Sequence, residues 1–403
     1  MQETQETKLW TKDFIFVSLI NFLLTLVFYL LVVTIATYAI DEYDASVSQS
    51  GLVSGVFIIG ALIGRFICGS IIDKIGRKQL LILGAVLFIV MTALYNVHVG
   101  VGFLIILRLV HGITHGMAST AAGTIVAQII PAPRKAEGIS YYSMSTTLAT
   151  ALGPFVGLYM LQHTTFPVIF VLCLILGIIS FVISMILKVP AAIKNTTKES
   201  AQILEKKARI SIKNFIEPKA VPIGFIILLL GFGYSSVLTY INFYATELNL
   251  VTAASFFFLV YSIMALISRP FTGPLMDRKG ANMIMYPAFI LYAISMYLLS
   301  VTGSGWLLLV AGAIMGLSFG NMQSATQAIS IKESAPERMG LATSTFFIFY
   351  DAGLGLSPYL LGYITPYTGY GNMYAIMAGV ILVTCVLYIF LHGLKETRRR
   401  KLA

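Results

Sequence analysis

Residues 69–78 read GSIIDKIGRK, and this stretch decides the fold. A long apolar run ends at its first glycine, and an acid, three cations and a second glycine follow. We interpret the stretch as a tight, charged turn between two membrane helices. A related stretch, GPLMDRKG, returns 204 residues later at 273–280, again at the end of an apolar run. A turn that occurs twice predicts a chain that is built twice.

The repeat extends beyond the turn. Over residues 58–78, eight of 21 positions are identical to those 204 residues later. Among the pairs that the same offset matches are Arg65 with Arg269, Asp73 with Asp277, Gly112 with Gly316 and Pro154 with Pro358. Parallel repeats of six helices are a transporter architecture, with the substrate site at the interface of the repeats.

The composition excludes an ordinary soluble protein. Of 403 residues, 58% are hydrophobic and only 11% are charged, and the mean hydropathy is +0.87. A spanning helix needs about 20 apolar residues, and the chain supplies such windows repeatedly. We therefore expect an all-α integral membrane protein with a six-helix bundle in residues 1–187, a linker at 188–220 and a second six-helix bundle in 221–403. The twelve helices are expected at 14–40, 48–71, 79–97, 101–129, 137–161, 165–187, 221–245, 252–274, 282–301, 304–329, 339–364 and 371–394.

The distribution of cations predicts the orientation in the membrane. All but three of the 27 Lys and Arg residues fall in loops or tails on one side of the predicted bundle. The three others, Arg65, Arg108 and Arg269, lie inside apolar runs. By the positive-inside rule the basic side is cytoplasmic, so we expect a cell-membrane protein with both termini in the cytoplasm. The net charge of +10 thus indicates orientation and not a nucleic-acid partner.

The chain carries no signature of an enzyme or of a cofactor site. Its three cysteines lie far apart within apolar runs, without the spacing of metal ligands. His111 and His115 have a spacing that suits a metal, but no third ligand lies near them in the sequence. A nucleophile motif and a phosphate-binding loop are also missing. We expect a protein that is not an enzyme and that needs no metal or cofactor.

Two ionisable residues inside apolar runs are candidates for proton coupling, because charges within a bilayer are costly and tend to be functional. Arg108 lies in the fourth predicted helix, where His111, Gly112 and His115 share its face. Asp351 lies about 16 Å into the eleventh helix, near mid-membrane. The alternatives are an arginine satisfied by backbone carbonyls and an aspartate held permanently by a neighbouring helix.

Polar and flexible positions complete the predicted site. Gly153, Pro154 and Gly157 interrupt the fifth helix and mark a hinge candidate. The expected cavity lining is Asn21, Thr25, His111, His115, Gln323 and Gln327. Each of these polar residues could instead make a hydrogen bond between helices.

At this point the sequence resembles the major facilitator superfamily over nearly its whole length, and within it the drug:proton antiporters with twelve helices. Residues 69–78 resemble the family's signature loop between helices two and three. Residues 104–112 are similar to its fourth-helix motif, which is implicated in proton coupling, with His111 where glutamine is often found. Residues 153–157 resemble the core of the fifth-helix antiporter motif, although Leu158 replaces its last glycine.

The resemblance implies alternating access, in which two halves rock about a central site. It also implies that the signature loop is a conformational latch, in which Asp73 faces the N-terminal end of the eleventh helix and holds the cytoplasmic side closed. The expected latch residues are Gly69, Asp73, Gly76, Arg77 and Asp277.

Three functions are compatible with these patterns. The first is proton-coupled efflux of small amphipathic compounds, with Arg108 and Asp351 in proton coupling. The second is proton-coupled import of a small nutrient or metabolite, and the third is a membrane sensor or scaffold that transports nothing. The expected partners are a small-molecule substrate, protons and the lipid bilayer, and we expect a monomer.

Overall fold

The computed structural model describes residues 8–131, 135–189, 216–334 and 339–402. Within this part, eleven helices are long and apolar enough to cross a membrane, which confirms the predicted all-α membrane fold. The helices of the first half are α1 (Lys12–Tyr43), α2 (Val47–Ile75), α3 (Arg77–Ala93), α4 (Val101–Ile129), α5 (Lys135–His163) and α6 (Phe166–Ile186). Those of the second half are α8 (Val221–Glu247), α9 (Val251–Lys279), α10 (Asn282–Ser300), α11 (Gly305–Lys332), α12 (Met339–Tyr388) and α13 (Leu394–Leu402).

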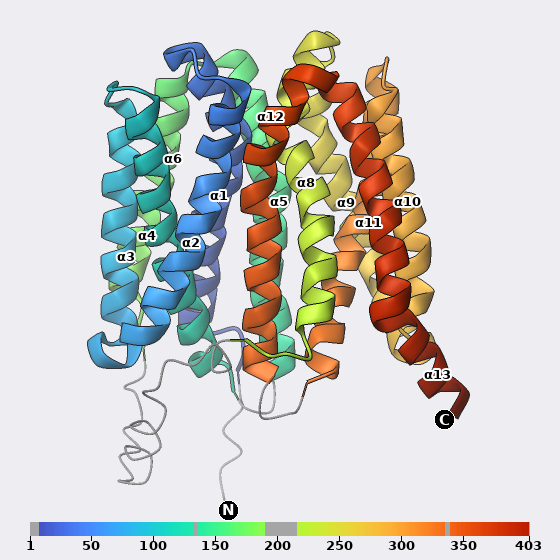
Figure 1. Cartoon of the computed structure of the whole chain (residues 1–403). Coiled ribbons are helices and arrows are strands. Elements are labelled where there is room, and N and C mark those ends of the chain that lie inside the picture. Colours follow the sequence, from blue (N-terminus) through green and yellow to red (C-terminus); the bar gives the residue numbers. More distant parts are fainter. Residues whose placement is uncertain (1–7, 132–134, 190–215, 335–338, 403) are drawn as a thin grey trace, which may run out of the picture.

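The twelfth predicted helix is the second arm of α12. Gly369 within this 50-residue element has φ 75° and ψ 164°, a conformation that only glycine adopts readily. The chain folds back there, so that α12 forms two antiparallel arms (Figure 1). The two helices predicted at 339–364 and 371–394 correspond to these arms.

The helix bounds repeat at the offset found in the sequence. Helix α9 begins and ends 204 residues after α2, and α11 and α12 begin 204 residues after α4 and α5. At the signature turn, Gly76 ends α2 with φ 100°, and at the second copy Gly280 ends α9 with φ 89°. The fold is therefore two pseudo-repeats of six helices. The linker at 188–220 stays a prediction, because residues 190–215 lie outside the described part.

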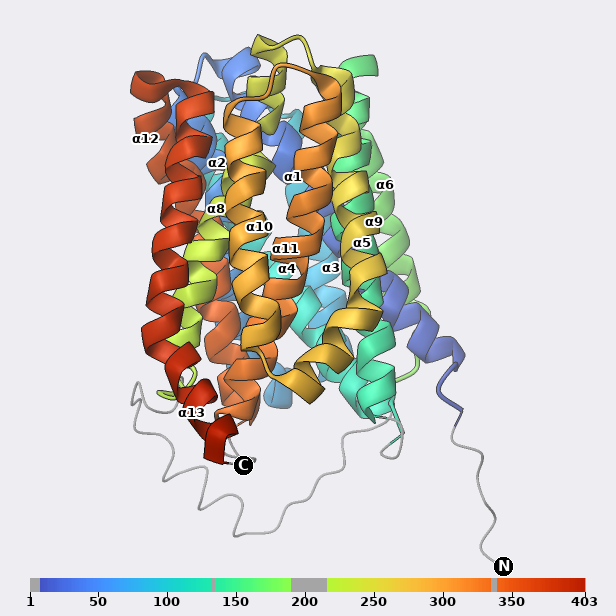
Figure 2. The ribbon, with the colours of Figure 1, turned by 90° about the vertical axis from the view of Figure 1, so that its right-hand side faces the viewer.

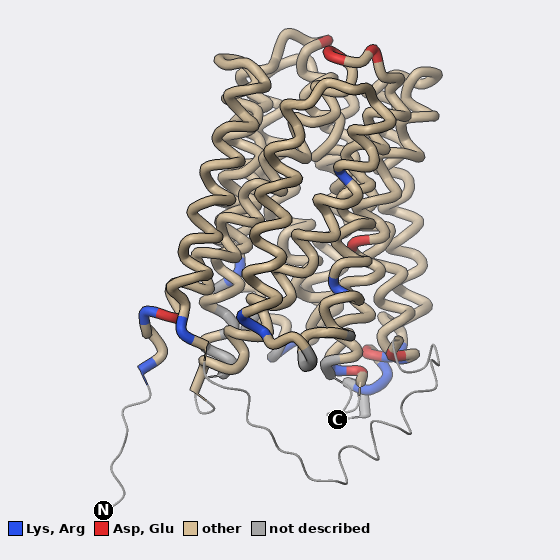
Figure 3. The backbone as a smooth tube through the Cα atoms, turned by 90° about the vertical axis from the view of Figure 1, so that its left-hand side faces the viewer, with Lys and Arg blue, Asp and Glu red and all other residues tan. Residues whose placement is uncertain are grey.

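Charge divides the two ends of the bundle. The first described residues and α13 lie at the same end, which we call the termini end, and the opposite end is the far end (Figures 1 and 2). Lys and Arg gather at the termini end, while the far end carries acidic residues (Figure 3). These acids include Asp41 and Glu42 near the end of α1 and Glu247 at the end of α8.

The two halves pack against each other toward the far end. Helix α2 contacts α12, and α5 contacts α9. Gly55 of α2 lies so close to Gly355 of α12 that a Cβ atom on Gly55 would collide with the Gly355 carbonyl oxygen. Further out, the side-chain amide of Asn242 donates to Thr37 Oγ1 at 3.2 Å, joining α8 to α1. Direct backbone contact between α2 and α12, together with this hydrogen bond, thus joins the halves toward the far end.

Candidate substrate cavity

A cavity of about 370 Å³ lies between the two halves. Its lining comes from α1, α2, α4 and α5 on one side and from α8, α9, α11 and α12 on the other. This volume falls in the range of small-molecule sites. The cavity has the place expected of a transport site, at the interface of the repeats.

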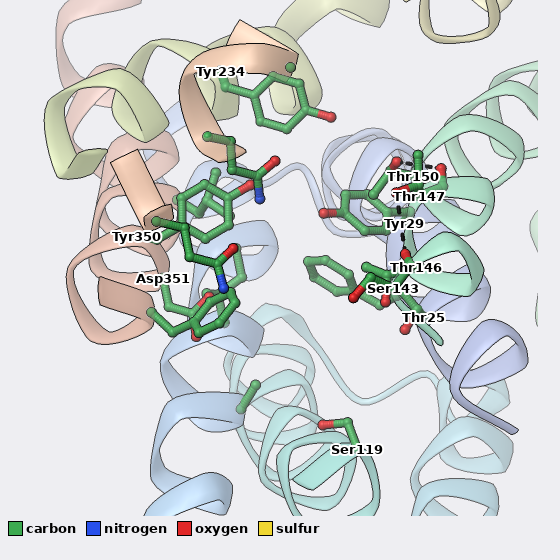
Figure 4. Close-up of a pocket in the computed structure, with 18 of the residues that line it drawn as sticks. Thr25, Tyr29, Ser119, Ser143, Thr146, Thr147, Thr150, Tyr234, Tyr350 and Asp351 are labelled. Atoms are coloured by element: carbon green, nitrogen blue, oxygen red, sulfur yellow. Dashed lines mark hydrogen bonds between the residues drawn. The ribbon is translucent and has the colours of Figure 1, made fainter. Parts of the chain in front are cut away.

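The cavity lining combines hydroxyls, aromatic rings and a carboxylate (Figure 4). Helix α5 presents hydroxyl groups from Ser143, Thr146, Thr147 and Thr150. Across the space lie Tyr234, Tyr350 and Asp351 of the second half. The cavity therefore offers both hydrogen-bonding groups and aromatic surface to a ligand.

An ion pair crosses the cavity between the halves. Arg65 of α2 donates through Nη1 to the Asp351 carboxylate of α12. The side chain of Asp351 is 8% exposed, and that of Arg65 is 35% exposed. Such a partly buried pair depends on both charges, because loss of either partner leaves the other desolvated and unpaired.

A second arginine in the cavity has a neutral partner. Arg269 of α9 donates through Nη1 to Thr147 Oγ1 of α5 at 3.0 Å, again between the halves. Its Nε is buried without a hydrogen-bond partner in the described part of the chain. The described lining therefore holds two guanidinium groups and one carboxylate.

Five of the six predicted cavity residues line this space: Asn21, Thr25, His115, Gln323 and Gln327. The Asn21 amide also donates to Ser145 Oγ and Thr146 Oγ1, both at 2.9 Å, so it joins α1 to α5. The role of these five residues in binding substrate stays a prediction.

The predicted place of His111 in the cavity needs correction. His111 is fully buried, with Nδ1 2.9 Å from the Tyr95 hydroxyl and Nε2 3.3 Å from Thr92 Oγ1. It thus faces α3 and the short helix η1 (Leu94–Asn96). The spacing of residues in the sequence shows that they lie on one face of a helix, but it does not show which neighbouring helix packs against that face.

Arg108 also lies outside the cavity lining. Its Nε donates to the Val53 carbonyl at 3.1 Å and its Nη1 to the Tyr95 hydroxyl at 3.3 Å. Its guanidinium carbon lies 4.4 Å from the centre of the Phe57 ring, and Phe57 itself lines the cavity. Arg108 and Asp351 are therefore not brought together, and Arg108 contacts the cavity lining through Phe57.

The predicted latch is described only in part. Gly69 is exposed, and Arg77 donates to the side-chain carbonyl of Gln128 at the end of α4. The side chains of Asp73 and Asp277 lie outside the described residues. The latch therefore stays a prediction.

The predicted hinge lies where α5 crosses α1. A Cβ atom on Gly153 would come within 2.6 Å of Tyr29 Cβ, and one on Gly157 within 2.8 Å of the Leu30 carbonyl oxygen. Pro154 lies inside the helix between them. The glycines thus permit close helix packing, and movement at this point stays a prediction.

Sequence reasoning missed much of the cavity lining, including the residues of both contacts between the halves other than Asp351. It found Arg65 and Arg269 inside apolar runs without assigning them a role, and it overlooked Thr147. The available signal was the repeat itself, because the 204-residue offset pairs Arg65 with Arg269 and also Thr147 with Asp351.

Comparison with known proteins agrees with this architecture. The model of the Major Facilitator Superfamily matches residues 17–350 and 251–403. An uncharacterized MFS-type transporter of Methanocaldococcus jannaschii is 26% identical over 356 residues, which cover 87% of this chain and 91% of that protein. The multidrug resistance protein MdtG of Citrobacter koseri is 24% identical over 365 residues, which cover 87% of this chain and 86% of that protein.

Among solved structures, the nucleoside transporter NupG superimposes with a TM-score of 0.71 at 14% identity, covering 94% of this chain and 99% of that one. At this identity the likeness concerns the fold alone. With a family model that spans both halves, the chain belongs to the Major Facilitator Superfamily.

Proposed function

We propose that this protein is a proton-coupled exporter of small amphipathic compounds that works by alternating access and is not an enzyme. The observation that carries the proposal is the ion pair between Arg65 and Asp351, because it joins the two halves inside the central cavity. Asp351 is the proton carrier in this scheme. The similarity to MdtG, a multidrug resistance protein, supports the direction of transport.

Protonation of Asp351 would change the contact between the halves. A neutral carboxyl group no longer forms an ion pair with Arg65, so the link across the cavity weakens when the proton arrives and strengthens when it leaves. A proton can thus bias the equilibrium between two arrangements of the halves, which is what coupling requires. In this scheme Arg108 acts on the cavity through its contact with Phe57.

The test is proton exchange in everted membrane vesicles that contain the full chain. A pH gradient is established, and a panel of amphipathic compounds is added one at a time while acridine orange reports the gradient. The wild-type protein is expected to dissipate the gradient with at least one compound. Asp351→Asn should lose this response and Asp351→Glu should keep part of it. An unchanged response in Asp351→Asn would contradict the coupling role.

A second function, proton-coupled import, is favoured by the charges of the cavity. Two arginines and one carboxylate leave an excess of positive charge, so an anion and a proton can occupy the cavity together. Accumulation of a compound by intact cells, driven by an inward proton gradient, would favour import over efflux.

The proposed setting is the cell membrane, with the termini end in the cytoplasm and the protein acting as a monomer. The gathering of Lys and Arg at that end supports this orientation (Figure 3). A cysteine introduced at Trp10, which is 58% exposed, should react with an impermeant maleimide only in opened cells. Labelling in intact cells would show that the termini end faces outward and would contradict the proposed orientation.

A further inference from the structure

The two arginines of the cavity occupy equivalent places in the two repeats but have different partners. Arg65 and Arg269 are 204 residues apart, and each reaches across the cavity to the opposite half. Arg65 contacts a carboxylate, Asp351. Arg269 contacts a hydroxyl, Thr147.

The partners are themselves equivalent. Asp351 lies 204 residues after Thr147, in helices that begin at the same offset. The two contacts are therefore equivalent in the two repeats, but only one of them includes a counter-ion for its arginine. Thr147 supplies an acceptor for one hydrogen bond, but it supplies no negative charge.

Arg269 thus lacks a counter-ion within the described part of the chain. Its Nε is buried and has no acceptor there, and the carboxylate in the cavity lining belongs to the pair with Arg65. A guanidinium group is always charged and matches carboxylate-like anions with two parallel hydrogen bonds. A cation that is held inside the bilayer without a counter-ion favours any anion that can enter.

The surroundings of Arg269 define the rest of the ligand. Its partner Thr147 lies on α5 with the other hydroxyls of the lining, and Gln323 of α11 also lines the cavity. Further along lie aromatic rings, with Phe28 stacked on Phe57 at 5.1 Å and Tyr234 facing Tyr261 at 5.6 Å. The cavity therefore combines a polar region that contains Arg269 with an aromatic region.

We propose that Arg269 binds the anionic group of the transported substrate, and that the substrate is a small organic anion with an aromatic or apolar body. The substrate anion would supply to Arg269 the negative charge that Asp351 supplies to Arg65. The inference rests on the proposed function in one respect, that this cavity is the transport site. It requires neither efflux nor proton coupling.

The test is binding to the purified full chain in detergent, where no gradient exists. The probes share one ring system and differ in charge: naphthalene-2-sulfonate, 2-naphthyltrimethylammonium and naphthalene-2-carboxamide. The shift of the unfolding temperature with probe concentration gives the affinity. Because a charge-assisted contact is worth about tenfold or more in affinity, the sulfonate should bind at least that much more tightly than the other two. Equal stabilisation by all three probes, or none by the sulfonate, overturns the proposal.

Variants locate the effect. Arg269→Gln should lose the preference for the sulfonate, and Arg269→Lys should keep part of it. Thr147→Asp places a carboxylate beside Arg269, so it should abolish the preference while the protein stays folded. If Arg269→Gln does not fold, the test relies on Thr147→Asp. A preference for the sulfonate that survives in Thr147→Asp overturns the proposal.

The matched control is Asp351→Asn. It removes the carboxylate from the other contact and leaves Arg269 in place, so it should keep or increase the preference for the sulfonate. The two proposals therefore fail separately. Loss of anion preference in the wild type contradicts the substrate class, whereas intact proton exchange in Asp351→Asn contradicts the coupling role.

Discussion

Arg65 and Arg269 hold equivalent positions in the two halves, yet one contacts an aspartate and the other a threonine. Duplication placed the same cation on both sides of the cavity, and the difference lies in the residue that faces it. In the proposed function a proton switches the contact with Asp351, whereas the contact with Thr147 holds no titratable acid. We therefore propose that one scaffold supplies two separate tasks, a titratable link and a fixed positive charge.

The halves also differ in their interiors. Arg108, Tyr95 and His111 form a buried polar network in the first half. The residues 204 positions later are Gly312, Leu299 and Met315, which are apolar or lack a side chain. The second half thus packs an apolar core where the first half holds a charge.

The largest effect is expected when the two partners, Asp351 and Thr147, are exchanged between the contacts with Arg65 and Arg269. Asp351→Thr alone should reduce proton-driven transport by about 100-fold, which corresponds to loss of a partly buried ion pair. Thr147→Asp added to it creates the ion pair at the second contact and should recover transport at least about tenfold relative to the single variant. Transport in proteoliposomes measures both steps, and a double variant no better than Asp351→Thr would show that the two contacts are not interchangeable.

Stability should separate the two arginines. Arg65→Gln leaves the Asp351 carboxylate without its cation, which should destabilise the protein by about 3 kcal/mol. Arg269→Gln removes a charge that has no counter-ion, so stability should change by less than about 1 kcal/mol. Unfolding temperatures in detergent measure the difference. Equal losses would mean that Arg269 has a structural partner comparable to Asp351.

The far end offers a test of movement between the halves. Gly55→Leu inserts a side chain where a Cβ atom already collides with Gly355, so the halves should no longer close there. Because the conformational cycle is interrupted, transport should fall about tenfold while probe binding in detergent persists. Gly102→Leu is the control, since a Cβ atom at Gly102 meets nothing within 4 Å. A similar loss in both variants would point to misfolding.

The smallest effect on the cavity is expected from a change in the buried network of the first half. Tyr95→Phe removes the hydrogen bonds to His111 at 2.9 Å and to Arg108 at 3.3 Å. It should cost about 1 to 3 kcal/mol of stability because buried partners are left unsatisfied. Sulfonate preference should not change, as Arg108 and His111 lie outside the cavity lining. A changed preference would connect the network to the site.

The fold was largely predictable because membrane helices are long apolar runs and the turn at 69–78 repeats. Each described membrane helix begins within two residues of the start that was predicted for it. The second arm of α12 was also expected as a separate helix. The bilayer imposes these features locally, so one sequence is sufficient to find them.

The site was harder to predict, because it depends on which helices face each other across the halves. Asp351 was found as a charge within the membrane, but its partner Arg65 lies 286 residues earlier in the chain. His111 and His115 are one turn apart, and only His115 lines the cavity. Helix periodicity gives a direction around each helix, whereas the identity of the neighbouring helix comes from the assembled bundle.

The contact between Gly55 and Gly355 has a consequence for leakage. A carrier that couples transport to an ion gradient loses energy whenever water or ions cross it without cargo. Where two main chains touch, no side chain has to reorient to complete the barrier and no file of water fits between them. Between α2 and α12 the barrier is therefore formed by the backbone itself, and we expect this protein to hold a proton gradient in the absence of substrate.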